Sequence, residues 1–353
     1  MELLSVTMSD GVKPRSEIEG KDNSSEDKSN YKIVRTGDMV YNSMRMWQGA
    51  NGISPCDGIV SPAYTVLMPK QPISNGYFAA LFKSPNLINE FRKNSQGMTS
   101  DTWNLKYPQI ETIRIHIPTL DEQEHISSML CTLEVRIAKQ AQLVEALKKY
   151  KRGLLHDVLS EKIRVTNSPW TRHRIGEFLS SKSIKQLPTE SAPLMAFTAT
   201  GGVCDKGERY DRGFLVKDAS TKLYKRTDYN DFIYSSNNLD VGSIGLNLYG
   251  SAVISDVYEI FSVANADPWF ISETIQQKSV LNRILKFRQG CLYGQYRIYA
   301  EDFQKVLIKL PPLEDQKRIG FLFSRISHRI EEEQRTLDSL EKMKSFFLQQ
   351  LFI

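Results

Sequence analysis

Two stretches of this chain carry the same pattern, IHIPTLDEQEHI at residues 115–126 and IKLPPLEDQKRI at residues 308–319. In each, a proline is followed at fixed spacing by a leucine, two acidic residues, a glutamine and an isoleucine. The prolines Pro118 and Pro311 are 311 − 118 = 193 residues apart. A motif that recurs in this way indicates that the chain contains copies of one unit.

Motifs upstream of these two stretches recur at nearly the same distance. Gln96 and Gln289 are 289 − 96 = 193 residues apart, and Tyr41 and Tyr234 are 234 − 41 = 193 residues apart. The opening LLSVTMSDGV, from residue 3, recurs as LMAFTATGGV from residue 194, at an offset of 194 − 3 = 191. A nearly constant offset over so many anchors identifies the chain as an internal duplication.

The period of this duplication is far longer than the repeat of a solenoid protein, so each copy is a whole domain followed by a helix. Two similar domains on one chain can be related by a pseudo-twofold axis. Dimeric DNA-binding proteins use that symmetry to match two half-sites. Unlike the subunits of a homodimer, the two copies can diverge and read different half-sites.

A long helix is predicted after each repeated proline. Apolar residues recur with alternating spacings of four and three, from Ile126 to Val158 and, at the same offset, from Ile319 to Leu351. This 3.5-residue period is typical of a coiled-coil seam. Both seams are interrupted at equivalent places, by Gln140 and Glu333 and by Lys151 and Lys344. The matched interruptions indicate that the two helices face each other, although each helix could instead pack only on its own domain.

The predicted helices are long enough to act as a spacer. A helix of about 39 residues is about 58 Å long, and one turn of DNA is about 34 Å. Between the helices, short runs typical of strands, such as YEIFSV at 258–263, alternate with amphipathic helical runs, such as residues 76–94, interrupted near Pro85. We therefore predict an α+β fold: two duplicated α/β domains separated by two long helices that pair as an antiparallel coiled coil. The expected boundaries are 1–118, 119–160, 161–311 and 312–353.

The composition and the known catalytic motifs favour a protein without catalysis of its own. The net charge of +5 is compatible with a polyanionic partner, the four cysteines are scattered, and no apolar run is long enough for a membrane span. We expect a cytoplasmic protein without metal or cofactor. DPWF at 267–270 lacks the second proline of an adenine methyltransferase motif, and a tight turn ending a strand is the simpler interpretation. EDQK at 314–317 has the letters of the (D/E)-x-K motif of nucleases, but it lies at the start of a predicted helix. The sequence contains no Walker A loop for ATP binding.

With these features in place, the chain resembles the specificity (S) subunits of Type I restriction-modification systems. YKIVRTGDMVYNSMRMWQGANGIS, from residue 31, resembles the first target-recognition domain of that family. The two P-x-L-acidic-acidic-Q-x-x-I elements and the helices after them resemble its two helical regions. The resemblance implies that each domain reads one half of a bipartite double-stranded DNA target and that the helices set the gap between the halves. It also implies docking of two methyltransferase (M) subunits, to which nuclease (R) subunits can add.

The first copy departs from this pattern at its beginning. The second domain opens with WTRHRIGEFL at residues 170–179, which resembles the opening strand and turn of the family. By the offset of the repeat, the counterpart of this stretch in the first copy would lie ahead of Met1. We therefore expect the first domain to lack its opening element and to be less stable for that reason.

Candidate DNA contacts are residues that can bind base edges or phosphates from loops. The loop GCLYGQYR at 290–297 and its counterpart GMTSDTWN at 97–104 are the strongest candidates, because they occupy equivalent places yet differ in sequence. The candidates of the first copy are Arg45, Trp47, Gln48, Arg92, Lys93, Gln96, Ser100 and Asn104. Those of the second copy are Lys222, Lys225, Arg226, Asn237, Asn238, Arg288, Gln289, Tyr293, Gln295, Tyr296 and Arg297.

Two other classes of protein are compatible with parts of the sequence. The chain could be the specificity module of a fused restriction-methylation enzyme whose catalytic domains are encoded upstream. It could also be a structural coiled-coil scaffold, but a scaffold gives no reason for divergence in the loops between matched anchors. The target sequence itself cannot be deduced from these residues.

Overall fold

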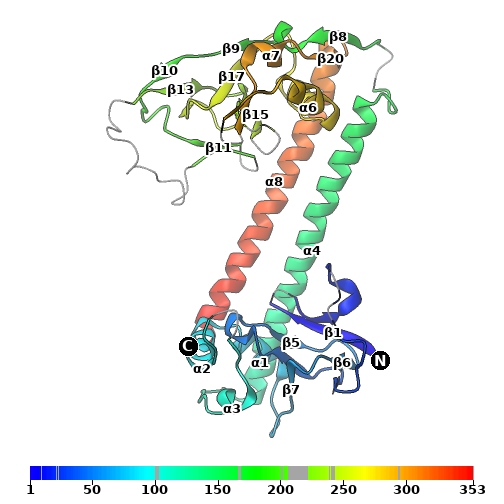
Figure 1. Ribbon diagram of the computed structural model, residues 1–353, viewed down its shortest axis with the longest axis vertical. Coiled ribbons are helices and arrows are strands. Elements are labelled where there is room, and N and C mark those ends of the chain that lie inside the picture. Colours follow the sequence, from blue (N-terminus) through cyan, green and yellow to red (C-terminus); the bar gives the residue numbers. More distant parts are fainter. Residues whose placement is uncertain are drawn as a thin grey trace. The chain divides into compact units, whose positions relative to one another are not determined.

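The computed structural model describes the chain apart from residues 9, 21, 23, 100–102, 166–167, 200–201, 206–221, 238, 240–242, 293–294 and 353 and the side chains of 291, 292 and 295. The chain forms two compact units (Figure 1). Unit 1 contains residues 1–144 and 332–353, and unit 2 contains residues 145–331. The described residues contain no helix both long and apolar enough to cross a membrane.

Among its described residues, unit 1 has two small sheets and three short helices. Its first sheet has the order β2-β1-β6-β3 (Gly11–Pro14, Glu2–Thr7, Gly58–Val60 and Lys32–Val34). Its second sheet has the order β5-β4-β7 (Asn51–Ile53, Met39–Asn42 and Tyr64–Leu67). The helices are α1 (Asn75–Leu81), α2 (Pro85–Asn94) and α3 (Tyr107–Ile110), with the 3₁₀ turns η1 (Arg15–Glu17) and η2 (Met46–Gln48).

Unit 2 has more strands among its described residues. Its larger sheets have the orders β15-β14-β17-β9 (Ile244–Leu246, Phe232–Ser235, Tyr258–Val263, Leu179–Ser181) and β10-β13-β16 (Lys185–Gln186, Tyr224–Thr227, Ala252–Ile254). The two-stranded pairs are β20-β8 (Leu307–Leu310, Thr171–Arg174), β11-β12 (Ala196–Thr198, Gly202–Cys204) and β18-β19 (Gln289–Leu292, Gln295–Arg297). The short helices are α5 (Pro268–Ile275), α6 (Lys278–Ile284) and α7 (Ala300–Gln304), with the 3₁₀ turns η3 (Ile175–Glu177) and η6 (Leu285–Phe287).

The duplication expected from the sequence is present in the secondary structure. Strand β4 begins at Met39 and β14 at Phe232, while helix α1 begins at Asn75 and α5 at Pro268. Both pairs of starting points are separated by the same offset as the repeated prolines Pro118 and Pro311. Residue 85 is the first residue of α2, so the predicted helix over 76–94 is interrupted at its proline as expected. Mixed strands and helices with two long helices confirm the α+β class.

The long helices are α4 (Leu120–Leu159) and α8 (Leu313–Gln350), and they pair in antiparallel fashion within each unit. In unit 1 the beginning of α4 packs near the end of α8, where Ile126 and Leu130 join the same apolar cluster as Phe347. In unit 2 Val158, near the end of α4, shares a cluster with Ile319, near the beginning of α8. The prediction that the two helices face each other is confirmed.

The polar interruption of the seam has a direct structural explanation. The side-chain amide Nε2 of Gln140 donates a hydrogen bond to the backbone carbonyl of Glu333, at 2.9 Å. These residues are each other's counterparts in the duplication, since 333 − 140 = 193. A residue can contact its own counterpart only at the centre of an antiparallel pair, so the polar residues fix the register of the helices.

The repeated glutamine of the motif attaches each short-helix layer to the start of a long helix. In unit 1 Gln123 accepts a hydrogen bond from the backbone N–H of Ser74 at 3.1 Å and donates to the carbonyl of Pro118 at 2.9 Å. In unit 2 Gln316 accepts from the N–H of Asp267 at 3.2 Å and donates to the carbonyl of Pro311 at 2.9 Å. Both glutamines are buried. We call this attachment of the short helices to the long helix the joint. The motif is repeated because each unit contains one such joint.

DPWF has a structural role at this joint. The Asp267 carboxylate accepts a hydrogen bond from the N–H of Phe270 at 2.8 Å and caps α5, with Pro268 at the first helical position. Burial is the main cause that raises the pKa of Asp267. The segment therefore starts a helix, whereas the sequence suggested a turn that ends a strand.

Candidate nucleic-acid interface

The two loops singled out from the sequence are built at equivalent positions by the same backbone pairing. In unit 1 the backbones of Gln96 and Asn104 pair through N–H···O distances of 3.0 and 2.8 Å. In unit 2 Gln289 pairs with Arg297 in the hairpin of β18 and β19. The offsets are 289 − 96 = 193 and 297 − 104 = 193. Each copy therefore presents a hairpin closed by the same two positions, where asparagine in one copy replaces arginine in the other.

Each hairpin is anchored by the residue that follows its closing pair. The N–H of Leu105 donates to the carbonyl of Ser43 at 2.8 Å, and the N–H of Ile298 donates to that of Ser236 at 2.9 Å. Both apolar side chains are fully buried. The base of each hairpin is thus attached to the buried core of its unit.

In unit 1 two of the predicted clusters meet around aromatic rings. The ring of Trp47 lies edge-on to that of Trp103, with their centroids 5.1 Å apart. The guanidinium of Arg92 lies 5.8 Å from the centroid of Trp47, within the range of a cation–π contact. The indole Nε1 of Trp47 donates to the carbonyl of Met44 at 3.2 Å. The resulting surface combines an exposed cation with flat rings next to the hairpin.

The other candidates of unit 1 surround this cluster. Arg45 precedes η2 and Gln48 is its last residue, and both are half-buried. Lys93 is exposed and forms an ion pair with Glu90 at 2.7 Å. The side-chain oxygen of Asn104 is buried and has no hydrogen-bond partner among the described residues. Buried polar atoms normally have partners. Ser100 lies outside the described residues.

In unit 2 a glutamate connects two of the predicted cations. Glu259 on β17 accepts from Lys225 at 3.0 Å and from Arg297 at 2.8 Å. Lys225 and Glu259 are only 12% and 13% exposed, whereas the side chain of Arg297 is 44% exposed. Arg297 also lies over the ring of Tyr299, 5.0 Å from its centroid. Lys225 thus stabilises the framework, and Arg297 is held by Glu259 while nearly half of its side chain stays exposed.

A second arginine of unit 2 lies against an aromatic ring of the hairpin. The guanidinium of Arg288 is 4.4 Å from the centroid of Tyr296, whose position corresponds to Trp103 in unit 1 because 296 − 103 = 193. Each hairpin therefore carries an aromatic ring at the same place. In unit 2 the arginine lies against this ring, whereas in unit 1 Arg92 lies against Trp47, which in turn contacts Trp103.

The remaining candidates of unit 2 have internal partners or lie outside the description. Arg226 binds Asp228 at 3.1 Å, the ammonium of Lys222 lies 5.2 Å from the ring of Tyr224, and Gln289 donates to Asp302. Asn237 forms a backbone bridge with Arg297. Asn238, Tyr293 and the side chain of Gln295 lie outside the described residues.

The sequence analysis missed several residues that shape these surfaces. Tyr299 and Glu259 were not among the candidates because they lie outside the candidate loops, and their contacts with Arg297 cannot be recognised from the sequence. Trp103 was not selected although it lies in the candidate loop at 97–104. Trp103 could have been found from the repeat, since Tyr296 was selected at the equivalent position. In the part of the chain that the structure describes, no three His, Cys, Asp or Glu residues are grouped as metal ligands.

Residues 9–149 match the family described as the Type I restriction modification DNA specificity domain. This match covers less than half of the chain, so it shows what these residues are similar to.

Two relatives illustrate the similarity. The chain is 22% identical over 285 residues to a protein of Methanocaldococcus jannaschii with the provisional name type I restriction enzyme MjaX specificity subunit. That alignment covers 76% of this chain and 64% of the relative, so the chain spans somewhat less than two thirds of the relative's length. The crystal structure of a Type-I restriction-modification system S subunit from M. genitalium has a TM-score of 0.65 at 14% identity, covering 91% of this chain and 84% of that one. This second likeness is one of fold.

Proposed function

We propose that this protein is the DNA-reading subunit of a Type I restriction-modification complex, in which each unit reads one half of a bipartite target. The match of residues 9–149 to the Type I restriction modification DNA specificity domain supports the general role. The observation that carries the finer assignment is the pair of equivalent hairpins, closed by Gln96 and Asn104 in one copy and by Gln289 and Arg297 in the other. The two hairpins are closed at the same positions and anchored by equivalent backbone hydrogen bonds, whereas their sequences differ.

The side chains at the hairpins have chemistry suited to DNA. Arginine can bind the edge of guanine through two hydrogen bonds, and asparagine can bind adenine in the same way. Aromatic rings beside arginines, as in Trp47 with Arg92, provide flat surfaces for contact with sugars or bases. At the equivalent positions Arg297 is 44% exposed and can reach a base edge, whereas the side-chain oxygen of Asn104 is buried, so the closing residues of the two hairpins offer DNA different groups.

The roles of the domains and helices follow from the resemblance to Type I specificity subunits. We propose target-recognition domains at 1–118 and 161–311 and spacer helices at 119–160 and 312–353. In this proposal the helices set the gap between the half-sites and dock two methyltransferase subunits, to which nuclease subunits can add. The chain itself performs no chemistry, and methylation and cleavage belong to these partners.

The experiment that tests this function is methylation in cells. The chain is co-expressed with the methyltransferase gene next to its own, and the host DNA is sequenced by a single-molecule method that detects methyladenine. Methylation at a bipartite motif with a fixed gap is the expected result. A soluble complex that methylates no motif, or methylates a continuous motif read by one unit, would contradict the proposal.

The spacer role has its own test. One whole heptad is inserted after equivalent positions in α4 and α8, so that the seam stays in phase. The preferred gap between the half-sites should then change while each half-site stays the same. If the gap does not change, the helices do not set it.

A further inference from the structure

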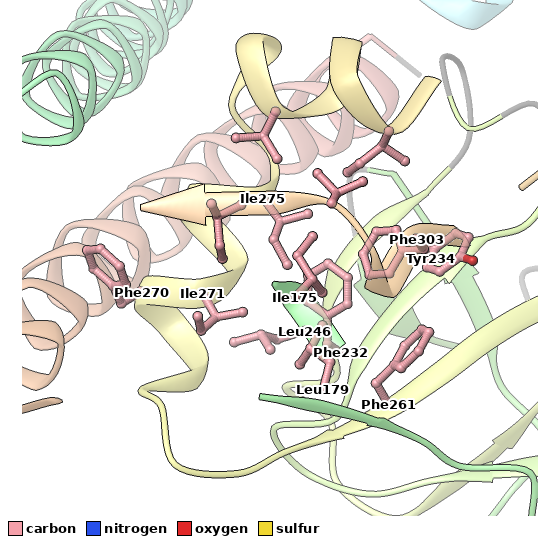
Figure 2. Packing of buried hydrophobic residues seen from close by; sticks show 14 of the residues in the cluster. Ile175, Leu179, Phe232, Tyr234, Leu246, Phe261, Phe270, Ile271, Ile275 and Phe303 are labelled. Carbon is pink, nitrogen blue, oxygen red and sulfur yellow. The ribbon is translucent and has the colours of Figure 1, made fainter. Parts of the chain in front are cut away.

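Unit 2 contains one contiguous segment that forms two strands at two different edges. Within Thr171–Ser181, strand β8 pairs with β20 in antiparallel fashion and strand β9 pairs with the outer edge of β17. The 3₁₀ turn η3 connects them. Ile175 and Leu179 of this segment are fully buried, and Figure 2 shows them among Phe232, Phe303 and the other apolar residues of the unit 2 core. The segment therefore completes both edges and part of the core.

Both of the corresponding edges in unit 1 are without such a partner among the described residues. Strand β7, the counterpart of β17, is the last strand of its sheet. Residues 114–117, the counterpart of β20 because 307 − 114 = 193, lie in no strand. Ile115 and Ile117 are 37% and 38% exposed, whereas Ile308 and Leu310, at the equivalent positions, are each 1% exposed. The same apolar positions are buried in one copy and exposed in the other.

A groove runs along the uncovered segment of unit 1. It has a volume of about 690 Å³ and is lined by Ile115, Ile117, Leu87, Ile126 and Phe352, among others. The groove, the exposed isoleucines and the free edge of β7 are three separate features. In unit 2 the single segment Thr171–Ser181 pairs with β20, pairs with β17 and contributes apolar side chains to the core at both edges.

We propose that these features form an acceptor site in unit 1 for one strand–turn–strand segment with the residue pattern of Thr171–Ser181. In this site the first strand pairs with residues 114–117, an apolar residue equivalent to Ile175 covers Ile115 and Ile117, and the second strand extends the sheet beyond β7. Addition of a strand to a free edge forms main-chain hydrogen bonds, and the alternating side chains fill the adjacent pockets. The inference does not depend on the proposed DNA-reading function.

The repeat also identifies the source of the segment. In unit 2 the segment precedes β11, and β11 corresponds to β1 because Ala196 and Ser5 share the offset 196 − 5 = 191 of the repeated opening. The equivalent place in unit 1 is the amino-terminal side of β1 on the same polypeptide. We therefore assign the occupant to a segment linked directly ahead of β1.

A grafted chain tests this assignment with the protein's own sequence. A copy of residues 170–191 is placed ahead of Met1, so that the offset of the repeated opening is preserved. Hydrogen exchange of the backbone amides is then measured at residues 64–67 and at Arg114 to Ile117. We expect exchange in both edges to slow by about tenfold or more, because each free edge gains a hydrogen-bonded strand.

Two controls separate specific pairing from a general effect of the added residues. The first carries the same graft with its copies of Ile175 and Leu179 replaced by aspartate, and the second carries the intact graft with Ile115→Asp. Both should lose the protection of residues 114–117. Unchanged exchange in the intact graft, or equal protection in the aspartate graft, would overturn the proposal. Protection by a free peptide of the same sequence but not by the graft would overturn the same-chain source. None of these readouts involves DNA, so failure of the proposed function would leave them unaffected.

Discussion

The two copies of the domain differ least where they attach to the helices and most where they face outward. The joints have the same two hydrogen bonds, with donor–acceptor distances of 3.1 and 2.9 Å at Gln123 and of 3.2 and 2.9 Å at Gln316. The closing pairs of the hairpins keep their backbone contacts but change a residue from Asn104 to Arg297. This difference teaches that the duplicated backbone is a fixed frame on which the outward-facing side chains vary.

A second difference concerns stability. Unit 2 contains the segment of β8 and β9 in its core, whereas the equivalent apolar positions of unit 1 are exposed. The matched lysines of the seam also differ in their partners. Lys151 binds Glu273 within unit 2, and Lys344 binds Glu134 within unit 1. Equivalent sequence positions thus contribute differently to the free energy of unfolding of the two units. Substitutions at matched positions can measure this difference.

The largest effect should come from the matched pair Ile308 and Ile115. Ile308→Asp places a carboxylate in the core of unit 2 and removes a buried side chain, so we expect it to destabilise that unit by about 4 kcal/mol or more. Ile115→Asp, at an exposed position, should cost about 0.5 kcal/mol or less. Urea unfolding of both variants checks this contrast. Equal losses would mean that residue 115 is buried in solution.

Much of the fold of the two units could be predicted from the sequence, but part of the fold and of the candidate site could not. The repeated motif and the seam from Ile126 to Val158 predicted the helices and their pairing, because the period of apolar residues determines which face is buried. That residues 114–117 lie in no strand was not predicted from the sequence. The roles of Lys225 and Glu259 could not be predicted, because the ion pair joins strands β13 and β17 that are distant in sequence. A lysine in a candidate loop and a lysine in a buried ion pair look the same in one sequence.

The next effect concerns DNA and compares the two hairpins. Arg297→Ala should weaken binding to the half-site read by unit 2 by about 1–3 kcal/mol, while the preference at the other half-site stays unchanged. Arg92→Ala should do the reverse. Binding to targets with substitutions in one half-site or the other, at a fixed salt concentration, measures this.

An equal loss on every DNA sequence would show that these arginines contact phosphates only. The matched control is Lys225→Met, since Lys225 shares Glu259 with Arg297 but is almost fully buried. If that variant changes the half-site preference as Arg297→Ala does, then the effect comes from the position of Glu259 and not from base contacts.

A smaller and symmetric effect is expected at the joints. Gln316→Ala leaves the N–H of Asp267 and the carbonyl of Pro311 without their partner, and Gln123→Ala does the same at Ser74 and Pro118. Each substitution should cost about 1–3 kcal/mol, the usual penalty for unsatisfied buried groups. Thermal unfolding followed in each unit separately checks it. A large cost in one unit and none in the other would show that the joints are not equivalent.

The smallest effect distinguishes the units by pH. In unit 2 Lys182 binds both Asp228 and Asp231, at 2.6 and 2.8 Å, whereas the position equivalent to Asp228 in unit 1 is Arg35. Burial raises the pKa of Asp228, but the hydrogen bonds from Lys182 and Arg226 outweigh it and hold the pKa well below the ordinary value. A carboxyl group with a lowered pKa in the folded state stabilises the protein above its unfolded pKa, and this contribution is lost as the pH falls.

Unit 2 should therefore lose stability as the pH falls below about 4, and Asp228→Asn should remove part of that dependence. Each partly exposed ion pair contributes about 1 kcal/mol or less, so the difference will be modest. Urea unfolding of unit 2 at pH 3, 4 and 6 measures it, with Glu190→Gln in unit 2 as the control for an exposed carboxyl group. An equal pH dependence in the Asp228→Asn variant and the unchanged chain would mean that this cluster does not stabilise unit 2. The contrast with Arg35 would then have no energetic consequence, and the greater stability expected of unit 2 would rest on its apolar core alone.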